Sequence, residues 1–200
     1  MDKISTVKHL SDEELASKIV NGSRSQFEEL VSRYSMRLFH FLRHRTETDQ
    51  DIEDLVQETF LKAFRSIDRF NPEWKFSTWL YTIASREAIS RHRLNKKMKS
   101  NPVRTSSLPG PEEIVIKKEE SQNIWALVST LPEKEYEALW LFYAEEMPIK
   151  DIARVIKKSP ITVRVLLYRA RLKLAQRIDQ TAFSKKLAGA NPAKHKFSLL

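Results

Sequence analysis

The sequence predicts an all-α fold of two small helical domains, an N-terminal helical bundle and a C-terminal helix-turn-helix, joined by an extended linker. Apolar residues recur at three- and four-residue spacing through most of the chain, as they do on amphipathic helices, and strand-like alternation is essentially absent. A stretch rich in proline, serine and cations, from about residue 96 to 113, breaks this periodicity. We therefore expect domains at 1–96 and 114–180, a linker at 97–113 and a flexible tail at 181–200. A long loop within one domain is the alternative, but loops of this length are uncommon.

The N-terminal domain is expected to contain four helices. Ser11 and Glu14 form a capping-box pattern at the start of a short helix that ends at Asn21-Gly22. A second helix carries an apolar stripe from Phe27 to Leu42. Two further helices lie between residues 48 and 93, and a short turn crowded with rings and cations joins them.

The C-terminal domain is expected to contain a helix-turn-helix. Proline marks the first turn of three helices, at Pro132, Pro148 and Pro160. The helix after Pro148 is short, and the helix after Pro160 is longer and strongly cationic. A tight turn between two such helices is typical of a DNA-binding helix-turn-helix.

Composition narrows the function classes. The chain of 200 residues has 35 Lys and Arg against 26 Asp and Glu, a formal net charge of +9, and this surplus favours a polyanionic partner, either nucleic acid or acidic lipid. No apolar run approaches membrane-spanning length and the N-terminus lacks a signal-peptide core, so we expect no membrane insertion. There is no cysteine, which excludes disulfides and is compatible with the cytoplasm.

A carboxylate face lies opposite the apolar stripe of the third helix. It consists of Asp51, Glu53, Asp54, Gln57 and Glu58. No histidine or second acidic cluster accompanies this face, so a metal or acid-base site is rejected. On composition alone a solvated surface is the default interpretation. The functional alternative is a docking face for a basic protein surface.

Catalytic signatures are absent from the sequence. The five histidines lack zinc-protease spacing, and no glycine-rich phosphate loop or serine elbow occurs. His40 and His44 lie four residues apart, but two ligands without a third are weak evidence for a metal. We therefore expect a protein without enzymatic activity, cofactor or metal.

The turn before the fourth helix combines rings with cations. Phe70, Trp74, Phe76 and Trp79 lie within ten residues of one another, beside Arg69 and Lys75. Such a cluster can stack exposed bases, although aromatic residues at helical spacing are usually buried. We expect Phe70, Phe76, Leu80 and Ile83 to be buried and Trp74 to be exposed, and we leave Trp79 undecided.

The last helix presents polar and cationic side chains away from its apolar stripe. In a helix-turn-helix the first residues of this helix enter the major groove. Arg164 can bind a guanine edge, whereas Ser159 and Thr162 can meet a base or a phosphate. The alternative is a solvated basic face on an ordinary core helix.

Three segments together resemble bacterial RNA polymerase sigma factors of the extracytoplasmic-function (ECF) group. Residues 51–60 (DIEDLVQETF) are similar to the core-polymerase-binding segment of that family, and residues 76–84 (FSTWLYTIA) to its promoter-melting segment. Residues 151–153, 162–164 and 168–171 resemble its helix-turn-helix for the −35 element. The resemblance covers roughly residues 11–178.

The resemblance implies three binding surfaces. The expected polymerase-binding residues are Asp51, Glu53, Asp54, Gln57, Glu58 and Leu61. The expected −10 DNA-binding residues are Asn71, Trp74, Lys75, Ser77, Trp79, Arg86, Arg91 and Arg93. The expected −35 DNA-binding residues are Ser159, Thr162, Arg164, Val165, Tyr168, Arg169 and Arg171.

The resemblance also implies partners. They are core RNA polymerase, through the clamp helices of its largest subunit and its flap region, promoter DNA, and an anti-sigma factor that covers the free protein. We expect a cytoplasmic alternative sigma factor that is monomeric when free of partners. The rival hypothesis is a helix-turn-helix transcriptional regulator that acts without docking on polymerase.

Four positions depart from the usual pattern of the family. Many relatives have Asn where Arg86 stands and Asp where Ser90 stands. Glycines common in the turn and at the start of the recognition helix are replaced by Lys157 and Ile161. A residue other than glycine in such a turn must accept strain or adopt a different turn.

Overall fold

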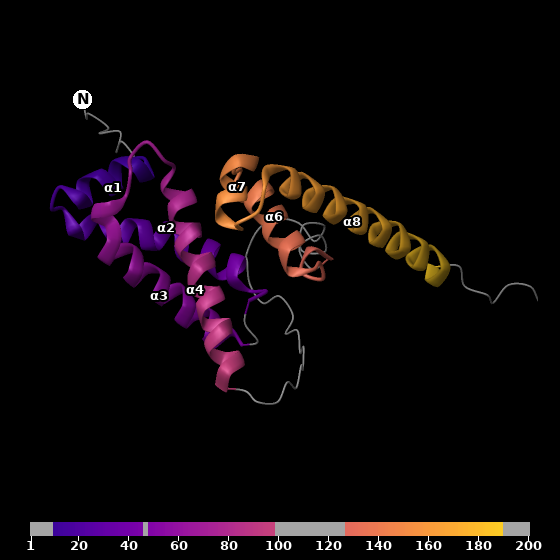
Figure 1. Ribbon diagram of the computed structural model, residues 1–200. Coiled ribbons are helices and arrows are strands. Elements are labelled where there is room, and N and C mark those ends of the chain that lie inside the picture. Colours follow the sequence, from indigo (N-terminus) through magenta and orange to yellow (C-terminus); the bar gives the residue numbers. More distant parts are fainter. Residues whose placement is uncertain (1–9, 46–47, 99–126, 190–200) are drawn as a thin grey trace, which may run out of the picture.

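The computed structural model describes residues 10–45, 48–98 and 127–189. The elements are α1 (Asp12–Val20), η1 (Arg24–Gln26), α2 (Phe27–Leu42), α3 (Asp49–Ser66), η2 (Ile67–Arg69), α4 (Phe76–Met98), α6 (Glu133–Tyr143), α7 (Ile149–Val155) and α8 (Pro160–Gly189). All regular elements in these residues are helical, which confirms the predicted all-α class (Figure 1). Most of the expected linker lies outside the described ranges. Residues 114–124, where the spacing of Ile114, Ile116 and Ile124 also predicts a helix, lie outside them too. Helix α8 continues past residue 179, where apolar periodicity ends in the sequence.

Side-chain caps determine where two of the N-terminal helices begin. At α1 the Glu14 amide donates to Ser11 Oγ at 3.2 Å, and the Ser11 amide donates to Glu14 Oε2 at 2.7 Å. This reciprocal pair is the capping box predicted from the sequence. At α3 the Asp51 amide donates to Thr48 Oγ1 at 3.1 Å, so the helix starts just before its acidic residues.

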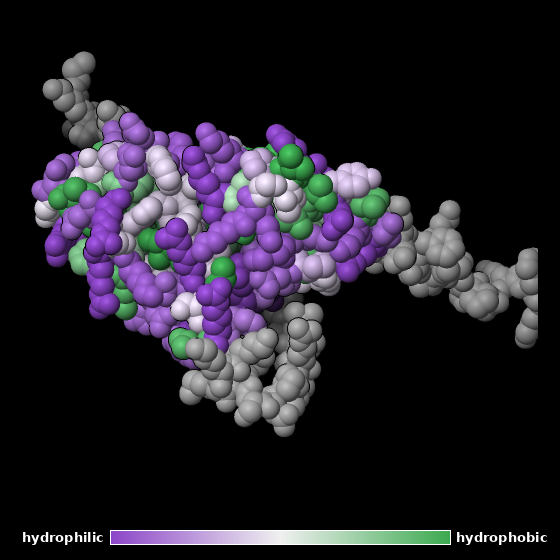
Figure 2. All heavy atoms as spheres, viewed as in Figure 1, coloured by the Kyte–Doolittle hydropathy of each residue, from purple (hydrophilic) through white to green (hydrophobic). Residues whose placement is uncertain are grey.

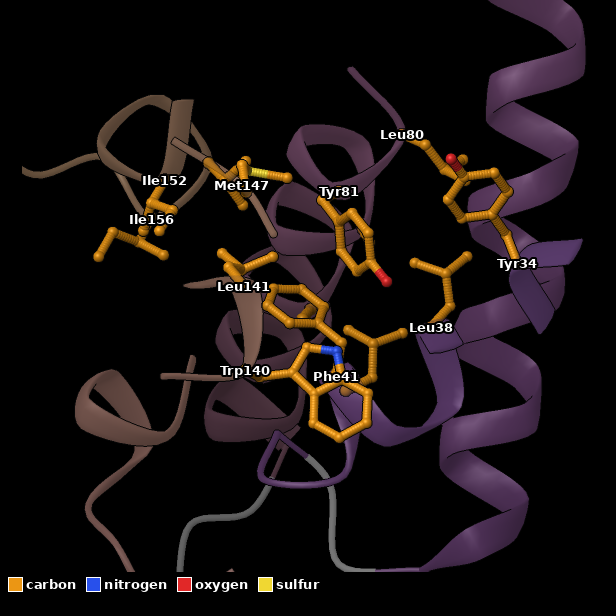
Figure 3. Packing of buried hydrophobic residues seen from close by; sticks show 14 of the residues in the cluster. Tyr34, Leu38, Phe41, Leu80, Tyr81, Trp140, Leu141, Met147, Ile152 and Ile156 are labelled. Atoms are coloured by element: carbon orange, nitrogen blue, oxygen red, sulfur yellow. The ribbon is translucent and has the colours of Figure 1, made fainter. Parts of the chain in front are cut away.

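The N-terminal bundle packs α1, α2, α3 and α4 around one core of apolar and aromatic side chains. Tyr34, Leu38 and Phe41 of α2 and Leu80 and Tyr81 of α4 are almost completely buried. The Phe41 and Tyr81 rings meet edge to face with centroids 4.9 Å apart, and Figure 3 shows these residues from close by. This core fixes α4 against α2 and α3, and thereby fixes the turn that precedes α4.

The burial expected in and after the aromatic turn, which we define as residues 70–75 between η2 and α4, is largely confirmed. Phe70, Phe76 and Leu80 are buried, whereas Ile83 is partly buried against the core. Trp79 is also only partly buried. Trp74 is exposed, as expected.

Helices α6, α7 and α8 form the C-terminal unit. Met147, Ile152 and Val155 lie buried beside Val163 and Leu167 of α8. The Thr162 amide donates to Ser159 Oγ at 3.1 Å and supports the start of α8. Lys157, in the turn between α7 and α8, has φ +53°. It therefore adopts the left-handed conformation that glycine would adopt without strain.

The two units are in direct contact through α6 on α2 and α7 on α4. In Figure 1, α7 lies beside α4 while α8 extends away from the bundle. Figure 3 shows Trp140 and Leu141 of α6 close to Phe41 and Tyr81 of the bundle. The Tyr136 hydroxyl donates to the backbone oxygen of His40 at 2.7 Å. Within the described ranges, no helix has the length and apolarity needed to cross a membrane.

Charged side chains also join the two units. Arg37 Nε donates to Glu145 Oε1 at 3.1 Å, and the second guanidinium nitrogen of Arg37 pairs with the other carboxylate oxygen. The Glu145 side chain is only 1% exposed. Arg45 forms ion pairs with Glu133, at 3.1 Å, and with the fully buried Glu137. We name these contacts of Arg37 and Arg45 with α6 and the residues after it the interdomain ion pairs.

Removal of the Leu38 side chain is expected to destabilise the N-terminal bundle. Leu38 is fully buried, so Leu38→Ala leaves a cavity and should lower the free energy of unfolding by about 2–5 kcal/mol. Met36→Ala, two residues away at a 56% exposed position, should change it by less than about 0.5 kcal/mol. Urea unfolding followed by circular dichroism measures both. Equal midpoints for the two variants would contradict the position of α2 in this core.

Glycine at position 157 is expected to stabilise the turn between α7 and α8. Lys157→Gly removes a left-handed strain of about 1–2 kcal/mol, and the added freedom of the unfolded chain cancels about half of the gain. The net gain should be about 0.5–1 kcal/mol, measured by thermal unfolding. The matched control is Lys150→Gly, inside α7, which should cost about 1 kcal/mol. A loss of stability with Lys157→Gly would show that the turn is not strained.

Candidate nucleic-acid and protein interfaces

Helix α3 presents an exposed acidic surface, which we name the acidic ridge and define as Asp51, Glu53, Asp54, Gln57 and Glu58. The opposite side of the helix is buried through Ile52, Leu55 and Ala63. Glu53, Gln57 and Glu58 are exposed, and Asp51 and Asp54 are partly exposed. Leu61 is 48% exposed and lies three residues after Glu58 on the same face. All six predicted polymerase-binding residues therefore lie on one accessible strip.

Acidic residues near the start of α3 also suit the helix itself. The helix N-terminus carries a partial positive charge, which favours nearby carboxylates. Asp49 and Asp51 lie in the first turn, and Arg65 lies in the last. The helix dipole therefore favours Asp51, the first carboxylate of the ridge.

Arg91 lies at the edge of the acidic ridge rather than among the exposed cations of α4. Its guanidinium donates to the backbone oxygen of Asp51 at 3.2 Å and to Asp54 Oδ2 at 3.1 Å. A third contact joins it to Asp51 Oδ1 at 3.6 Å. Arg86 and Arg93, which the sequence assigns to the same DNA-binding group, are exposed. Arg91 thus bridges two surfaces that the sequence analysis treats as separate.

The aromatic turn between η2 and α4 exposes part of its ring cluster. The Trp79 ring packs at 5.5 Å from Phe70 and 5.7 Å from Phe76. Trp74 projects to the surface with 45% of its area exposed. The Glu73 amide donates to Asn71 Oδ1 at 3.0 Å and shapes the turn that presents Trp74.

The remaining −10 candidates surround Trp74. Lys75 is exposed, at 3.9 Å from Glu13 of α1. Ser77 is partly exposed at the start of α4. The guanidinium of Arg154, from α7, lies over the Trp74 ring at 4.7 Å from its centroid. Sequence reasoning missed this contact, because it joins residues from the two domains.

Helix α8 exposes most of the predicted −35 residues. Ser159, Arg164, Val165, Tyr168, Arg169 and Arg171 are exposed, and Thr162 is partly buried. Ser159 and Thr162 share a hydroxyl–hydroxyl hydrogen bond of 2.9 Å. Arg171 Nε donates to the Tyr143 hydroxyl at 2.9 Å, so this cation lies against α6.

An apolar group accompanies these polar residues on α8. Ile161 is 71% exposed and lies one turn before Val165, which is 40% exposed. Figure 2 shows a largely hydrophilic face with small hydrophobic patches, one of them over the first half of α8. This apolar group was not predicted from the sequence, although Ile161 replaces a glycine that is common at that position.

Several titratable groups are partly or fully buried where the two domains meet. Burial lowers the pKa of His40 and His44, so both rings are neutral near pH 7, and Arg43 acts in the same direction. Burial raises the pKa of Glu137, while Arg45 and Lys134 oppose that change. The residues that the structure describes contain no group of three or more His, Cys, Asp or Glu able to hold a metal ion.

Comparison with known proteins agrees with this arrangement. Residues 30–98 match Sigma-70 region 2, and residues 121–174 match Sigma-70, region 4. The ECF RNA polymerase sigma-E factor of Haemophilus influenzae is 30% identical over 185 residues, which cover 86% of this chain and 97% of that protein. The ECF RNA polymerase sigma factor SigW of Bacillus subtilis is 26% identical over 174 residues, which cover 80% of this chain and 93% of that protein.

A solved structure shows the same fold. The sigma factor RpoE of Bartonella quintana, crystallised with the anti-sigma factor NepR, superposes with a TM-score of 0.67 at 23% identity, over 78% of this chain and 98% of that one. The order of the two matched regions agrees with the order of the acidic ridge, the aromatic turn and the helix-turn-helix. These findings show that the chain belongs to the ECF group of RNA polymerase sigma factors, the DNA-binding initiation factors that direct core polymerase to the −10 and −35 elements of promoters.

Proposed function

We propose that the acidic ridge is the surface by which this sigma factor docks on core RNA polymerase. The observation that carries the proposal is the exposure of the predicted polymerase-binding residues on one face of α3, with the opposite face buried. A basic surface, such as the clamp helices of the largest polymerase subunit, would complement these carboxylates. Leu61 adds an apolar contact at the end of the strip. The chain supplies binding free energy, and the polymerase carries out the chemistry.

The aromatic turn and α4 are proposed to bind the −10 element as an unpaired strand. Removing a base from the stack costs a few kcal/mol, and stacking on an aromatic side chain returns about 1–3 kcal/mol. Trp74 offers the accessible ring, with Lys75, Arg86 and Arg93 available for phosphates. Arg154 must leave the Trp74 ring before a base can stack on the face that it covers.

Helix α8 is proposed to bind the −35 element in the major groove. Arg164 is exposed near the start of the helix and suits bidentate hydrogen bonding to guanine. Val165 and the neighbouring Ile161 suit contact with thymine methyl groups. Ser159, Thr162, Tyr168 and Arg169 then lie beside the groove walls and the phosphates.

Simultaneous binding of both promoter elements requires the domains to separate. The names −10 and −35 place the two elements about 25 base pairs apart. This spacing corresponds to about 85 Å of duplex at about 3.4 Å per base pair. In this structure Arg154 of the helix-turn-helix lies 4.7 Å from the Trp74 ring. The interdomain ion pairs therefore have to break when the protein engages a promoter within the polymerase. The C-terminal unit is then free to reach the flap region.

An anti-sigma factor is proposed as the partner of the free protein. The sigma factor RpoE of Bartonella quintana has been crystallised with its anti-sigma factor NepR. A protein that spans α4 and α8 would hold the domains together and cover the DNA-binding residues. We place this regulation in the cytoplasm, on a monomeric sigma factor.

Reversal of charge on the acidic ridge is expected to weaken docking on core polymerase. The Asp54→Arg and Glu58→Arg double variant should bind core polymerase about 10- to 100-fold more weakly, because cations would face the basic docking surface. The matched control is Glu28→Arg with Asp68→Arg, which reverses two exposed acids away from the ridge. Fluorescence anisotropy measures affinity for core, and run-off transcription on genomic fragments measures promoter-specific initiation.

Two results would contradict docking of this protein on polymerase through the acidic ridge. If the ridge variant binds core as tightly as the control, polymerase docks elsewhere on the chain. Failure of the wild-type chain to confer promoter-specific starts on core polymerase would favour a regulator that binds duplex DNA alone. Circular dichroism of both variants verifies that the helices remain folded.

Arg37→Glu is expected to separate the two domains, and the additional change Glu145→Arg is expected to bring them together again. Arg37→Glu places two carboxylates together at an interface where the Glu145 side chain is 1% exposed, so the units should separate. Adding Glu145→Arg restores opposite charges and should restore most of the contact. Because the chain has no cysteine, cysteines at exposed positions 28 and 150 can carry a fluorophore pair that reports the domain separation. Equal energy transfer in all three proteins would show that this ion pair does not hold the domains together.

A further inference from the structure

Arg91 connects the polymerase-docking surface to the DNA-binding helix. It belongs to α4, yet its guanidinium lies 3.1 Å from Asp54 Oδ2 and 3.6 Å from Asp51 Oδ1 of α3. The Arg91 side chain is 24% exposed, and the side chains of Asp51 and Asp54 are 40% and 45% exposed. Both carboxylates therefore remain accessible to another protein while Arg91 is bound to them.

We infer that Arg91 couples polymerase docking to −10 DNA binding by exchanging one anionic partner for another. In the free protein it pairs with both Asp51 and Asp54. A basic surface that docks on the ridge competes for Asp54 and releases the guanidinium. The released cation then binds a phosphate of the unpaired strand that α4 holds. This inference rests on the proposed docking of the ridge.

The charges on α3 support such an exchange. Within the described residues Glu53 and Glu58 form no ion pair, whereas Asp51 and Asp54 share Arg91. Two of the four ridge carboxylates are thus held by a cation of the chain itself. A docking partner that uses the ridge must replace this cation or share the carboxylates with it. The exposure of Asp54 permits the replacement without unfolding either helix.

The position of Arg91 on α4 supports the second half of the exchange. Arg86, His92 and Arg93 are exposed on the same stretch of helix. Lys62 of α3 pairs with Glu87 of α4, which provides a second link between the two helices when Arg91 leaves. The long arginine side chain can therefore change partner by rotation about its own bonds while α4 stays in place.

Coupling of this kind is reciprocal. If docking on polymerase releases Arg91 for DNA, then DNA on Arg91 uncovers Asp54 and strengthens docking by the same factor. A purely structural role, in which Arg91 only ties α4 to α3, predicts neither effect. Removal of a structural tie would weaken the bundle and leave the number of phosphate contacts unchanged.

The test measures the salt dependence of DNA binding with and without core polymerase. The probe is a fluorescent single strand carrying the −10 element of a promoter mapped by run-off transcription. Arg91→Ala and Arg91→Met are compared with wild type, and the methionine variant retains much of the apolar stem. Arg93→Ala removes an exposed cation that has no contact with the ridge, and it serves as the matched control.

The expected result differs between the complex with core polymerase and the free protein. In complex with core, loss of the Arg91 phosphate contact should reduce the slope of log K against log salt by about 0.7. In the free protein both Arg91 variants should have the wild-type slope, whereas Arg93→Ala should reduce the slope in both states. Affinity of the Arg91 variants for core without DNA should equal that of wild type or exceed it by up to roughly threefold, because a competing cation is gone.

Three outcomes overturn the inference. The first is weaker binding of core by both Arg91 variants, which would mean that Arg91 organises the carboxylates for docking. The second is a reduced slope in the free protein, and the third is an unchanged slope in the complex. These outcomes are distinct from failure of ridge docking itself, which would appear as unchanged affinity of the Asp54→Arg and Glu58→Arg variant for core, because the Arg91 variants leave every ridge carboxylate in place.

Discussion

The packing of α4 against α3 is the constraint on which both N-terminal binding surfaces depend. Each helix buries one face in the common core, so the acidic ridge and the cations of α4 emerge side by side. Lys62–Glu87 and Arg91–Asp54 join the two helices across their surface. The net charge of +9 does not reveal this separation of charges, because the chain also carries the acidic ridge. In the proposed complex, the acidic ridge faces polymerase and the cations of α4 face DNA.

Local features of the fold could be predicted from the sequence because their causes are local. The Ser11 capping box and the stripe from Phe27 to Leu42 need only neighbouring residues, and both occur as expected. The exposure of Trp74 and the burial of Phe76 follow from their places relative to the apolar stripe of α4. Apolar periodicity did not predict the end of α8, because the helix continues after its apolar pattern has ended.

Contacts between distant residues could not be predicted in the same way. Arg37 and Glu145 are 108 positions apart, and nothing in either local sequence identifies the other as its partner. Arg91 illustrates the same difficulty within the predicted site. Its sequence context suggests a DNA-facing cation, but its environment also depends on the side of α4 that meets α3. Roles that follow from a sequence motif could therefore be predicted, whereas roles that follow from packing between distant residues could not.

The chemistry of the domain interface explains how a closed protein can still open. Separating an apolar interface exposes apolar surface to water, which is unfavourable, whereas separated ions regain their hydration. Arg45, Glu137 and Glu145 are nearly inaccessible when closed, so their desolvation cancels much of the attraction between them. Trp140 and Leu141 add apolar contact that favours closure until a partner supplies a better one. An interface with this balance suits the proposed cycle, in which an anti-sigma factor keeps the domains together and binding to polymerase and DNA separates them.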